Sequence, residues 1–166
     1  GAPRQAGVYT TSDRGSVWFG SPVPRIAAAL LAGVAGRSEL RWGSVPLTVK
    51  GVQLEDTPDH QAGHAVFESL TPVLLRSENE YILPDHNAYE DRLRHNLAHR
   101  ADVLGLPNEV DLEVLGSGPR RRFEVQKKPR IGATIRVRVA AAPTLLDALY
   151  VGGIGLATNQ GFGWLR

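Results

Sequence analysis

The amino-acid sequence predicts an α+β protein in which short antiparallel strands are joined by tight turns and accompanied by a few helices. Eighteen glycines and eleven prolines in 166 residues imply many turns, which favours short strands over a bundle of helices. Several short segments alternate apolar and polar residues, and longer ones carry apolar residues at helical spacing. The lack of cysteine excludes disulfide bonds and thiolate metal sites. No apolar run approaches the roughly 18 residues that a bilayer span needs.

The first part of the chain is expected to contain strands and one helix. Val8–Thr11 and Val17–Gly20 are rich in strand-forming residues, and the Asp-Arg-Gly sequence between them predicts a hairpin. An alanine- and leucine-rich helix is predicted over Arg25–Ala35, where Gly36 ends it. Alternating β-branched and polar residues predict a strand over Leu40–Leu54, kinked at its central glycine. The expected order is therefore β, β, α, β.

A polar segment, Glu55–His64, is expected to link this part to the second. A proline inside Ala65–Leu75 predicts that this strand is bulged or lies at a sheet edge. The other predicted elements are, in chain order, a helix over Pro84–Leu104, short strands over Asp111–Leu115, Arg121–Val125 and Thr134–Ala140, a helix over Pro143–Tyr150, a glycine-rich loop over Gly152–Gly163 and a final strand over Phe162–Leu165.

The second half thus follows the order β, α, β, β, α, β, which is that of the ferredoxin-like fold, a four-stranded antiparallel sheet backed by two helices. The first half matches the same plan without its opening strand and helix. We therefore predict tandem ferredoxin-like (RRM-like) domains, of which the first, residues 1–58, is incomplete. The second, residues 65–166, carries the glycine-rich loop at its C-terminus.

Positive charge is concentrated in one short segment. From Pro119 to Arg138 eight residues are basic and Glu124 alone is acidic, whereas the preceding 118 residues carry ten basic and fifteen acidic side chains. Such a block on an otherwise acidic chain suggests a surface for a polyanion. The alternative is a solvated edge hairpin that resists aggregation. The basic residues are Arg120, Arg121, Arg122, Lys127, Lys128, Arg130, Arg136 and Arg138.

Strand geometry suggests how these residues could act together. Successive strand residues point to opposite faces, so Arg120 and Arg122 are expected on one face and Arg136 and Arg138 on another shared face. Two such pairs on neighbouring strands would form a cationic ridge for phosphates, and arginine forks also contact guanine edges.

The C-terminal sequence Gly153-Ile-Gly155-Leu-Ala-Thr-Asn-Gln-Gly161-Phe-Gly163-Trp has a Gly-hydrophobic-Gly, five-residue, Gly-hydrophobic-Gly pattern. It resembles the glycine-rich loop of the RAMP superfamily at all four glycines and both hydrophobic positions. The strand and helix over residues 65–97, with Asn96 and Leu97 on the helix, are similar to the second domain of the Cas-six group of CRISPR repeat-RNA endoribonucleases.

This resemblance implies a function. Members of the group cut precursor CRISPR RNA within each repeat, so the expected partner is CRISPR repeat RNA, and other CRISPR effector subunits are further candidates. The cleavage is expected to need neither metal nor cofactor, because the ribose 2′-hydroxyl attacks its own phosphate and leaves a 2′,3′-cyclic phosphate and a 5′-hydroxyl. A cytoplasmic location is expected. An open sheet edge in the first domain would favour a homodimer.

The glycine-rich loop is expected to contact RNA. Gly153, Gly155, Gly161 and Gly163 would let the backbone approach phosphates and direct N–H groups outward. The side chains of Thr158, Asn159 and Gln160 would add polar contacts. The alternative is a tight loop that only packs a helix against the final strand.

The resemblance does not identify the general base of the cleavage reaction. In the family this base is a histidine near the first helix, and no matching position exists here. His95 and His99, four residues apart on the predicted helix, are candidates. The other possibilities are a base in an N-terminal segment that this chain lacks, or a chain that only binds RNA. The HNLAH sequence lacks the glutamate of a zinc protease, so these histidines do not predict a metal site.

Three functions therefore remain. The first is the repeat-RNA endoribonuclease. The second is a non-catalytic RNA-binding RAMP subunit of a CRISPR effector complex. The third is a ferredoxin-like interaction module without a nucleic-acid role.

Overall fold

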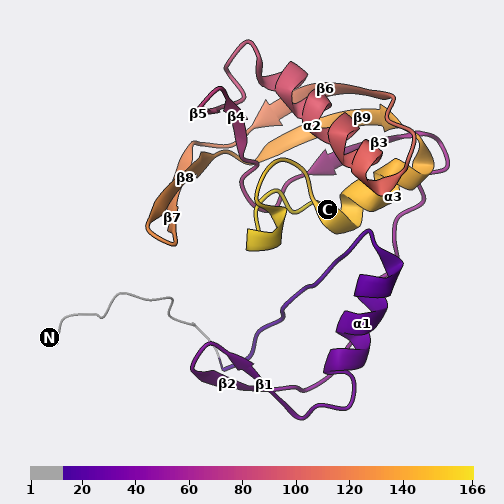
Figure 1. The fold of residues 1–166 in the computed structure, drawn as a ribbon, viewed down its shortest axis with the longest axis vertical. Helices are drawn as coiled ribbons and strands as arrows, with labels where there is room; N and C mark the ends of the chain where they lie inside the picture. Colours follow the sequence, from indigo (N-terminus) through magenta and orange to yellow (C-terminus); the bar gives the residue numbers. More distant parts are fainter. Residues whose placement is uncertain (1–12) are drawn as a thin grey trace, which may run out of the picture.

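The computed structural model describes residues 13–166 and contains three α-helices, nine strands and one short 3₁₀ helix in that range (Figure 1). In chain order these are α1 (Pro24–Val34), β1 (Glu39–Trp42), β2 (Val45–Thr48), β3 (His64–Glu68), β4 (Leu75–Ser77), β5 (Glu80–Ile82), α2 (Tyr89–Leu104), β6 (Val110–Ser117), β7 (Arg121–Val125), β8 (Lys128–Gly132), β9 (Ile135–Ala141), α3 (Pro143–Gly152) and η1 (Thr158–Gln160).

The central sheet has the ferredoxin-like order. β9 pairs antiparallel with β3 on one side and with β6 on the other. The C-terminal residues add a further antiparallel edge beside β3, because the backbones of Glu68 and Arg166 exchange two hydrogen bonds of 3.0 and 3.1 Å. Ser69 and Leu165 also form a bridge. The spatial order is therefore C-terminal segment, β3, β9, β6, which confirms the predicted α+β, ferredoxin-like fold.

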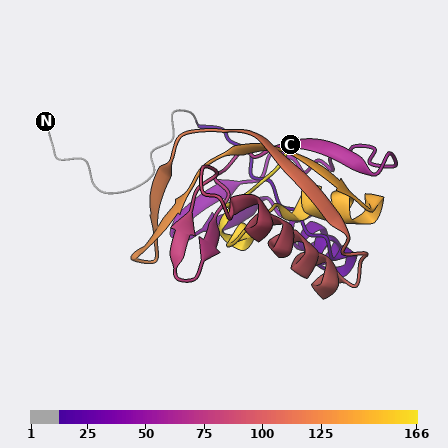
Figure 2. The ribbon, with the colours of Figure 1, turned by 90° about the horizontal axis from the view of Figure 1, so that it is seen from above.

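Both helices of this unit cover the same face of the sheet (Figures 1 and 2). Alternation along β9 puts Ile135, Val137 and Val139 under the helices and leaves the intervening side chains exposed. Side chains of α2 that lie about one helical turn apart contact these three residues. The leucines of α3, two of which are adjacent in the sequence, contact them as well. The buried helical residues include Leu93, Leu97, Ala101, Leu145, Leu146 and Leu149.

Two hairpins extend from this unit. β7–β8 lies between β6 and β9 in the chain, and β4–β5 follows β3. The predicted single strand over Ala65–Leu75 was wrong, because β3 ends at Glu68 and Leu75 begins the β4–β5 hairpin. Pro72 lies in the break, where its missing N–H cannot continue a strand ladder.

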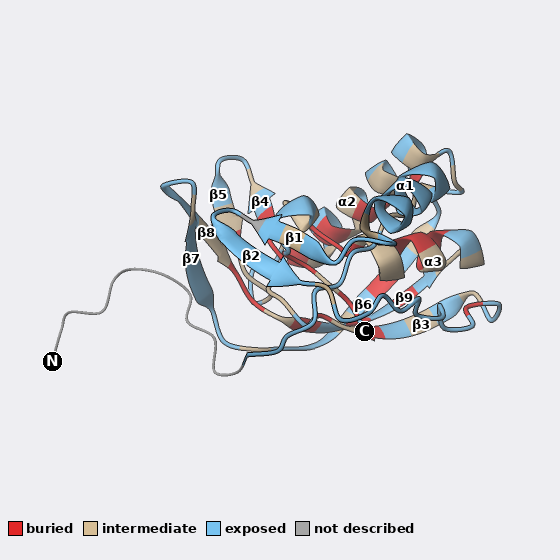
Figure 3. Cartoon of the chain, turned by 90° about the horizontal axis from the view of Figure 1, so that it is seen from below, coloured by how far each residue is buried: buried red, intermediate tan, exposed pale blue. Residues whose placement is uncertain are grey.

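The N-terminal part carries little buried surface (Figure 3). α1 matches the predicted helix, and it has no buried residue. The strand expected over Leu40–Leu54 is instead the β1–β2 hairpin, which reverses at Gly43 with φ of +62°. The strand expected over Val17–Gly20 is absent, and Val8–Thr11 lies outside the described residues.

Contacts from Trp18, Gly20 and His60 help to attach this part to the sheet unit. The rings of Trp18 and Trp164 meet edge to face, with centroids 5.7 Å apart. Gly20 lies so close to the Val151 carbonyl that a Cβ would overlap it. His60, in the predicted linker, is buried and its Nδ1 lies 2.7 Å from Asp147 Oδ1 on α3. No helix within residues 13–166 is long and apolar enough to cross a membrane.

Candidate nucleic-acid interface

The β7–β8 hairpin presents most of the basic segment to solvent. Arg120, Arg121, Arg122, Lys127 and Lys128 are all exposed. Within residues 13–166 none of these five side chains forms an ion pair with a carboxylate. Their charge is therefore not neutralised by the protein itself, which is the electrostatic condition for binding a polyanion.

The hairpin turn places one of these lysines at the tip. Gln126 and Lys127 both have positive φ, +51° and +60°, as the central residues of a type I′ turn do. Neither residue is glycine, so the turn carries a conformational cost. The charge is thereby held at the outermost point of the hairpin.

Arg136 and Arg138 lie elsewhere, on the open face of the central sheet. They share one face of β9, as alternation predicted. Each is paired with a carboxylate of a neighbouring strand: Arg138 with Glu113 of β6, and Arg136 with Glu68 of β3, at 3.9 Å. The expected ridge of two arginine pairs on neighbouring strands was wrong, because β7 pairs with β8 and not with β9.

A third arginine of this open face is also paired with a carboxylate. Arg166 donates a hydrogen bond of 2.8 Å to Glu68. That bond and the positive charge of Arg166 are the main reasons why the pKa of Glu68 lies below its ordinary value, with a smaller effect of Arg136. An RNA phosphate would have to compete with these carboxylates for either β9 arginine.

The glycine-rich loop donates its backbone N–H groups inward rather than outward. Gly153 N–H bonds to Leu149 O, Gly161 N–H to Thr158 O and Gly163 N–H to Pro72 O, at 2.8 to 3.0 Å. The N–H of Gly155 donates to Asn96 Oδ1 at 3.1 Å. The expectation that the four glycines point their N–H groups outward is not met in this structure.

Close packing explains three of the four glycines. Gly153, Gly155 and Gly163 have positive φ, and a Cβ on any of them would collide with backbone. At Gly155 it would lie 2.8 Å from Leu74 O, and at Gly153 2.7 Å from Gly163 O. Gly161 differs, because it has open space around it. The outer part of the loop is formed by η1, where Asn159 and Gln160 are exposed and Thr158 is half-buried.

Two side chains of α2 form hydrogen bonds to the backbone of the glycine-rich loop. Asn96 accepts the Gly155 N–H, and Arg100 donates from Nη1 to the carbonyls of Gly152 and Gly153 and from Nη2 to that of Gly155. Arg100 is largely buried, and this burial lowers the pKa of its guanidinium. The resemblance placed Asn96 on this helix, but no sequence pattern indicated that Arg100 serves the loop.

The hairpin and the loop meet through aromatic and backbone contacts. Phe123 of β7 lies edge to face against Phe162, with ring centroids 5.6 Å apart. Gly132, at the end of β8, packs against Val73, while Gly155 packs against Leu74. The basic hairpin and the glycine-rich loop therefore converge on one side of the sheet unit, as Figure 1 shows.

The histidines lie apart from this convergence or are engaged elsewhere. His95 and His99 are exposed on α2, on the side away from Leu93 and Leu97. His64 Nδ1 lies 3.1 Å from Ala62 O. His60 is buried against Asp147.

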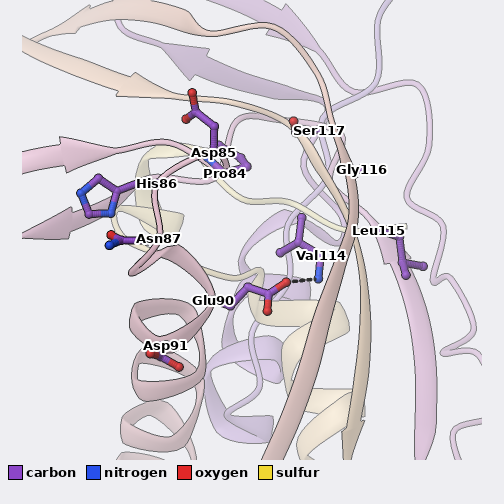
Figure 4. A pocket seen from close by; sticks show the side chains of 10 residues that line it. All are labelled: Pro84, Asp85, His86, Asn87, Glu90, Asp91, Val114, Leu115, Gly116 and Ser117. Carbon is purple, nitrogen blue, oxygen red and sulfur yellow. Dashed lines mark hydrogen bonds between the residues drawn. The ribbon is translucent and has the colours of Figure 1, made fainter.

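A fifth histidine, His86, lines a hollow between the start of α2 and the end of β6 (Figure 4). Its Nδ1 accepts the Ala88 N–H at 3.1 Å. Asp85, Glu90 and Asp91 line the same hollow, and Glu90 accepts the Val114 N–H at 2.7 Å. These carboxylates make the hollow unfavourable for a phosphate.

Fold and loop together define a RAMP-type protein with a ferredoxin-like domain. The model of the family CRISPR associated protein Cas6, C-terminal, matches residues 55–166, and the chain belongs to this family.

Solved structures share the fold. A structure described as CRISPR associated protein Cas6 is 20% identical with a TM-score of 0.69, and one of a Cas6-related gene product from Pyrococcus furiosus is 20% identical with a TM-score of 0.67. A RAMP protein described as binding different RNA substrates is 22% identical with a TM-score of 0.67. Each match covers 89% of this chain and 65% of the other, so the chain spans just under two thirds of these relatives. Comparison with curated protein sequences gives no match.

Proposed function

We propose that the chain binds CRISPR repeat RNA and takes part in cutting it, without a metal, by attack of a ribose 2′-hydroxyl on the adjacent phosphate. Membership of the Cas6 family supports a role in CRISPR RNA processing. The observation that carries the proposal is the meeting of an unneutralised basic hairpin with the glycine-rich loop, through Phe123 and Phe162.

RNA would be held mainly by Arg120, Arg121, Arg122, Lys127 and Lys128, which form no ion pair with a carboxylate within residues 13–166. The hairpin would place a stem so that its backbone passes the outer edge of the glycine-rich loop. There the side chains of Thr158, Asn159 and Gln160, and the open backbone at Gly161, are the groups within reach. Gly153, Gly155 and Gly163 would act indirectly, because they give the loop its shape.

The reaction makes three demands on the protein. It must remove the 2′ proton, hold the attacking oxygen in line with the leaving 5′ oxygen, and stabilise the charge that builds on the phosphate oxygens. The arginines of the hairpin can meet the third demand. The attack forms one P–O bond as the bond to the 5′ oxygen breaks, so the products are a 2′,3′-cyclic phosphate and a 5′-hydroxyl.

A non-catalytic RNA-binding subunit is the second candidate function. It is favoured by the position of His95 and His99, which lie on the solvent side of α2 while Asn96 and Arg100 of the same helix reach the loop. In that case the chain would bind the stem and leave it intact.

Incubation of the purified chain with a repeat-hairpin RNA in EDTA tests the proposal. We expect a fragment that resists 3′-end ligation until the cyclic phosphate is removed to leave a 3′-hydroxyl, and a second fragment whose 5′ end is phosphorylated by polynucleotide kinase. Arg120→Gln combined with Arg121→Gln should weaken binding of the RNA and slow the cleavage. Retention of intact RNA under all conditions would favour the non-catalytic subunit, and failure to bind the RNA would reject both functions.

A further inference from the structure

A second basic surface lies beside the β7–β8 hairpin, in a groove that opens between this hairpin and β4–β5. The groove has a volume of about 560 Å³. Both hairpins line it, and β5 and β8 lie against each other. Its charged and aromatic lining residues are Arg76, Glu80, Tyr81, Arg120, Lys128 and Arg130.

The charges in this groove are unbalanced. Arg76, Arg120, Lys128 and Arg130 face a single carboxylate, Glu80. In the described part of the chain none of the four cations forms an ion pair. Clustered cations of one sign repel each other, so the groove is stabilised by an anion.

Arg130 has a hydrogen-bond donor that lacks an acceptor within residues 13–166. Its Nη1 donates to the Tyr81 hydroxyl at 3.1 Å and so ties the two hairpins together. Its Nε is buried and has no acceptor among the described residues. A buried donor without a partner is unfavourable, and a phosphate oxygen that reaches it would satisfy it, since guanidinium and phosphate match in geometry.

Tyr81 adds a flat surface. The guanidinium of Arg76 lies over its ring, 5.3 Å from the centroid, while Arg130 holds its hydroxyl. Unpaired RNA bases stack on aromatic rings and on arginine planes, whereas the bases of a stem are already stacked inside the duplex. A nucleotide that uses both features of the groove must therefore be unpaired.

We propose that this groove binds an unpaired nucleotide flanking the RNA stem, with its phosphate on Arg130 and Arg120 and its base against Arg76 and Tyr81. The inference rests on the proposed RNA function and extends it, because the stem would occupy the outer surface of β7–β8 and the flank would continue toward β4–β5. It assigns to β4–β5 a role in substrate recognition.

Fluorescence anisotropy on the full chain tests this with two labelled RNAs, a blunt repeat stem and the same stem with a single-stranded flank of about eight nucleotides. Arg76→Gln and Tyr81→Leu should each weaken binding of the flanked RNA about tenfold, the effect of losing one stacked base. The blunt stem should lose less than about threefold. Arg37→Gln, which removes the same charge beyond α1, should change neither.

Tyr81→Phe keeps the ring and should keep most of the affinity for the flanked RNA, which separates stacking from a folding defect. Equal weakening for both RNAs, or none for either, would overturn the assignment of the groove. If Arg76→Gln and Tyr81→Leu leave the affinity for both RNAs unchanged while the native chain still binds the stem, only this inference fails. If the native chain binds neither RNA, the proposed function fails with it.

Discussion

At the scale of single residues, the glycine-rich loop is a packed structure rather than an open cradle. Gly153, Gly155 and Gly163 are needed because backbone lies where a side chain would begin. The polar groups that face solvent belong to η1 instead. The motif is therefore specified first by packing, and the proposed contact with RNA depends on the shape that this packing gives the loop.

Gly163 and Gly161 form a matched pair for testing this, because both have positive φ, +65° and +85°. A Cβ at Gly163 would overlap Ile154 O, whereas at Gly161 it would meet open space. Gly163→Ala should lower the free energy of unfolding by more than about 3 kcal/mol. Gly161→Ala should cost about 1 kcal/mol, the strain of the left-handed backbone alone. Urea unfolding measures both, and equal costs would contradict the packing account.

Arg100 supplies the second residue-scale prediction. Arg100→Met keeps length and removes the donors to three carbonyls of the loop, so it should cost about 2 to 3 kcal/mol. Arg94→Met on the same helix breaks only ion pairs with Asp91 and Asp111 near the surface and should cost less than about 1 kcal/mol. Thermal unfolding compares the two. If Arg100→Met unfolds at the same temperature as the native chain, the loop does not depend on this side chain.

At the scale of elements, one aromatic contact joins the basic hairpin to the glycine-rich loop. Phe123 is 40% exposed, yet its ring meets Phe162 of the loop. The contact joins an extension of the sheet to the C-terminal segment, far apart in the chain. It holds β7, the strand that carries Arg121 and Arg122, against the C-terminal segment.

Removing that ring should release the hairpin without unfolding the domain. Phe123→Ala should cost about 1 kcal/mol and raise the rate of amide hydrogen exchange in β7 and β8 but not in β9. Phe123→Tyr keeps the ring and serves as the control. Unchanged exchange in Phe123→Ala would mean that the hairpin is held by its other contacts, such as that of Arg130 with Tyr81.

The sequence predicted elements with long or regular patterns and missed those that depend on pairing. α1, α2, β7 and β9 fall within a residue or two of expectation, except for the start of α2. The β4–β5 hairpin was missed because its strands have three residues each and its turn uses Glu78 at positive φ instead of glycine. The carboxylate partners of Arg136 and Arg138 were missed because strand register is not visible in a single sequence.

At the scale of the whole molecule, charge is distributed unevenly. The arginines of the open sheet face, Arg136, Arg138 and Arg166, are each paired with a carboxylate, while within residues 13–166 the cations of the β7–β8 hairpin and the adjoining groove form no ion pair. The N-terminal part, with α1 and β1–β2, covers little of the sheet unit. The division into residues 1–58 and 65–166 stays a prediction, although buried His60 associates the linker with α3.

The dependence of RNA affinity on salt tests the central claim most directly, since each phosphate contact contributes about 0.9 to the slope of log K against log salt concentration for a duplex. Replacing Arg120, Arg121 and Arg122 with glutamine should lower the slope by about 2 to 3. The same number of replacements at Arg25, Arg37 and Arg41 should leave it unchanged. An unaltered slope in the hairpin variant, or no retention of RNA by the native chain at low ionic strength, would contradict the account.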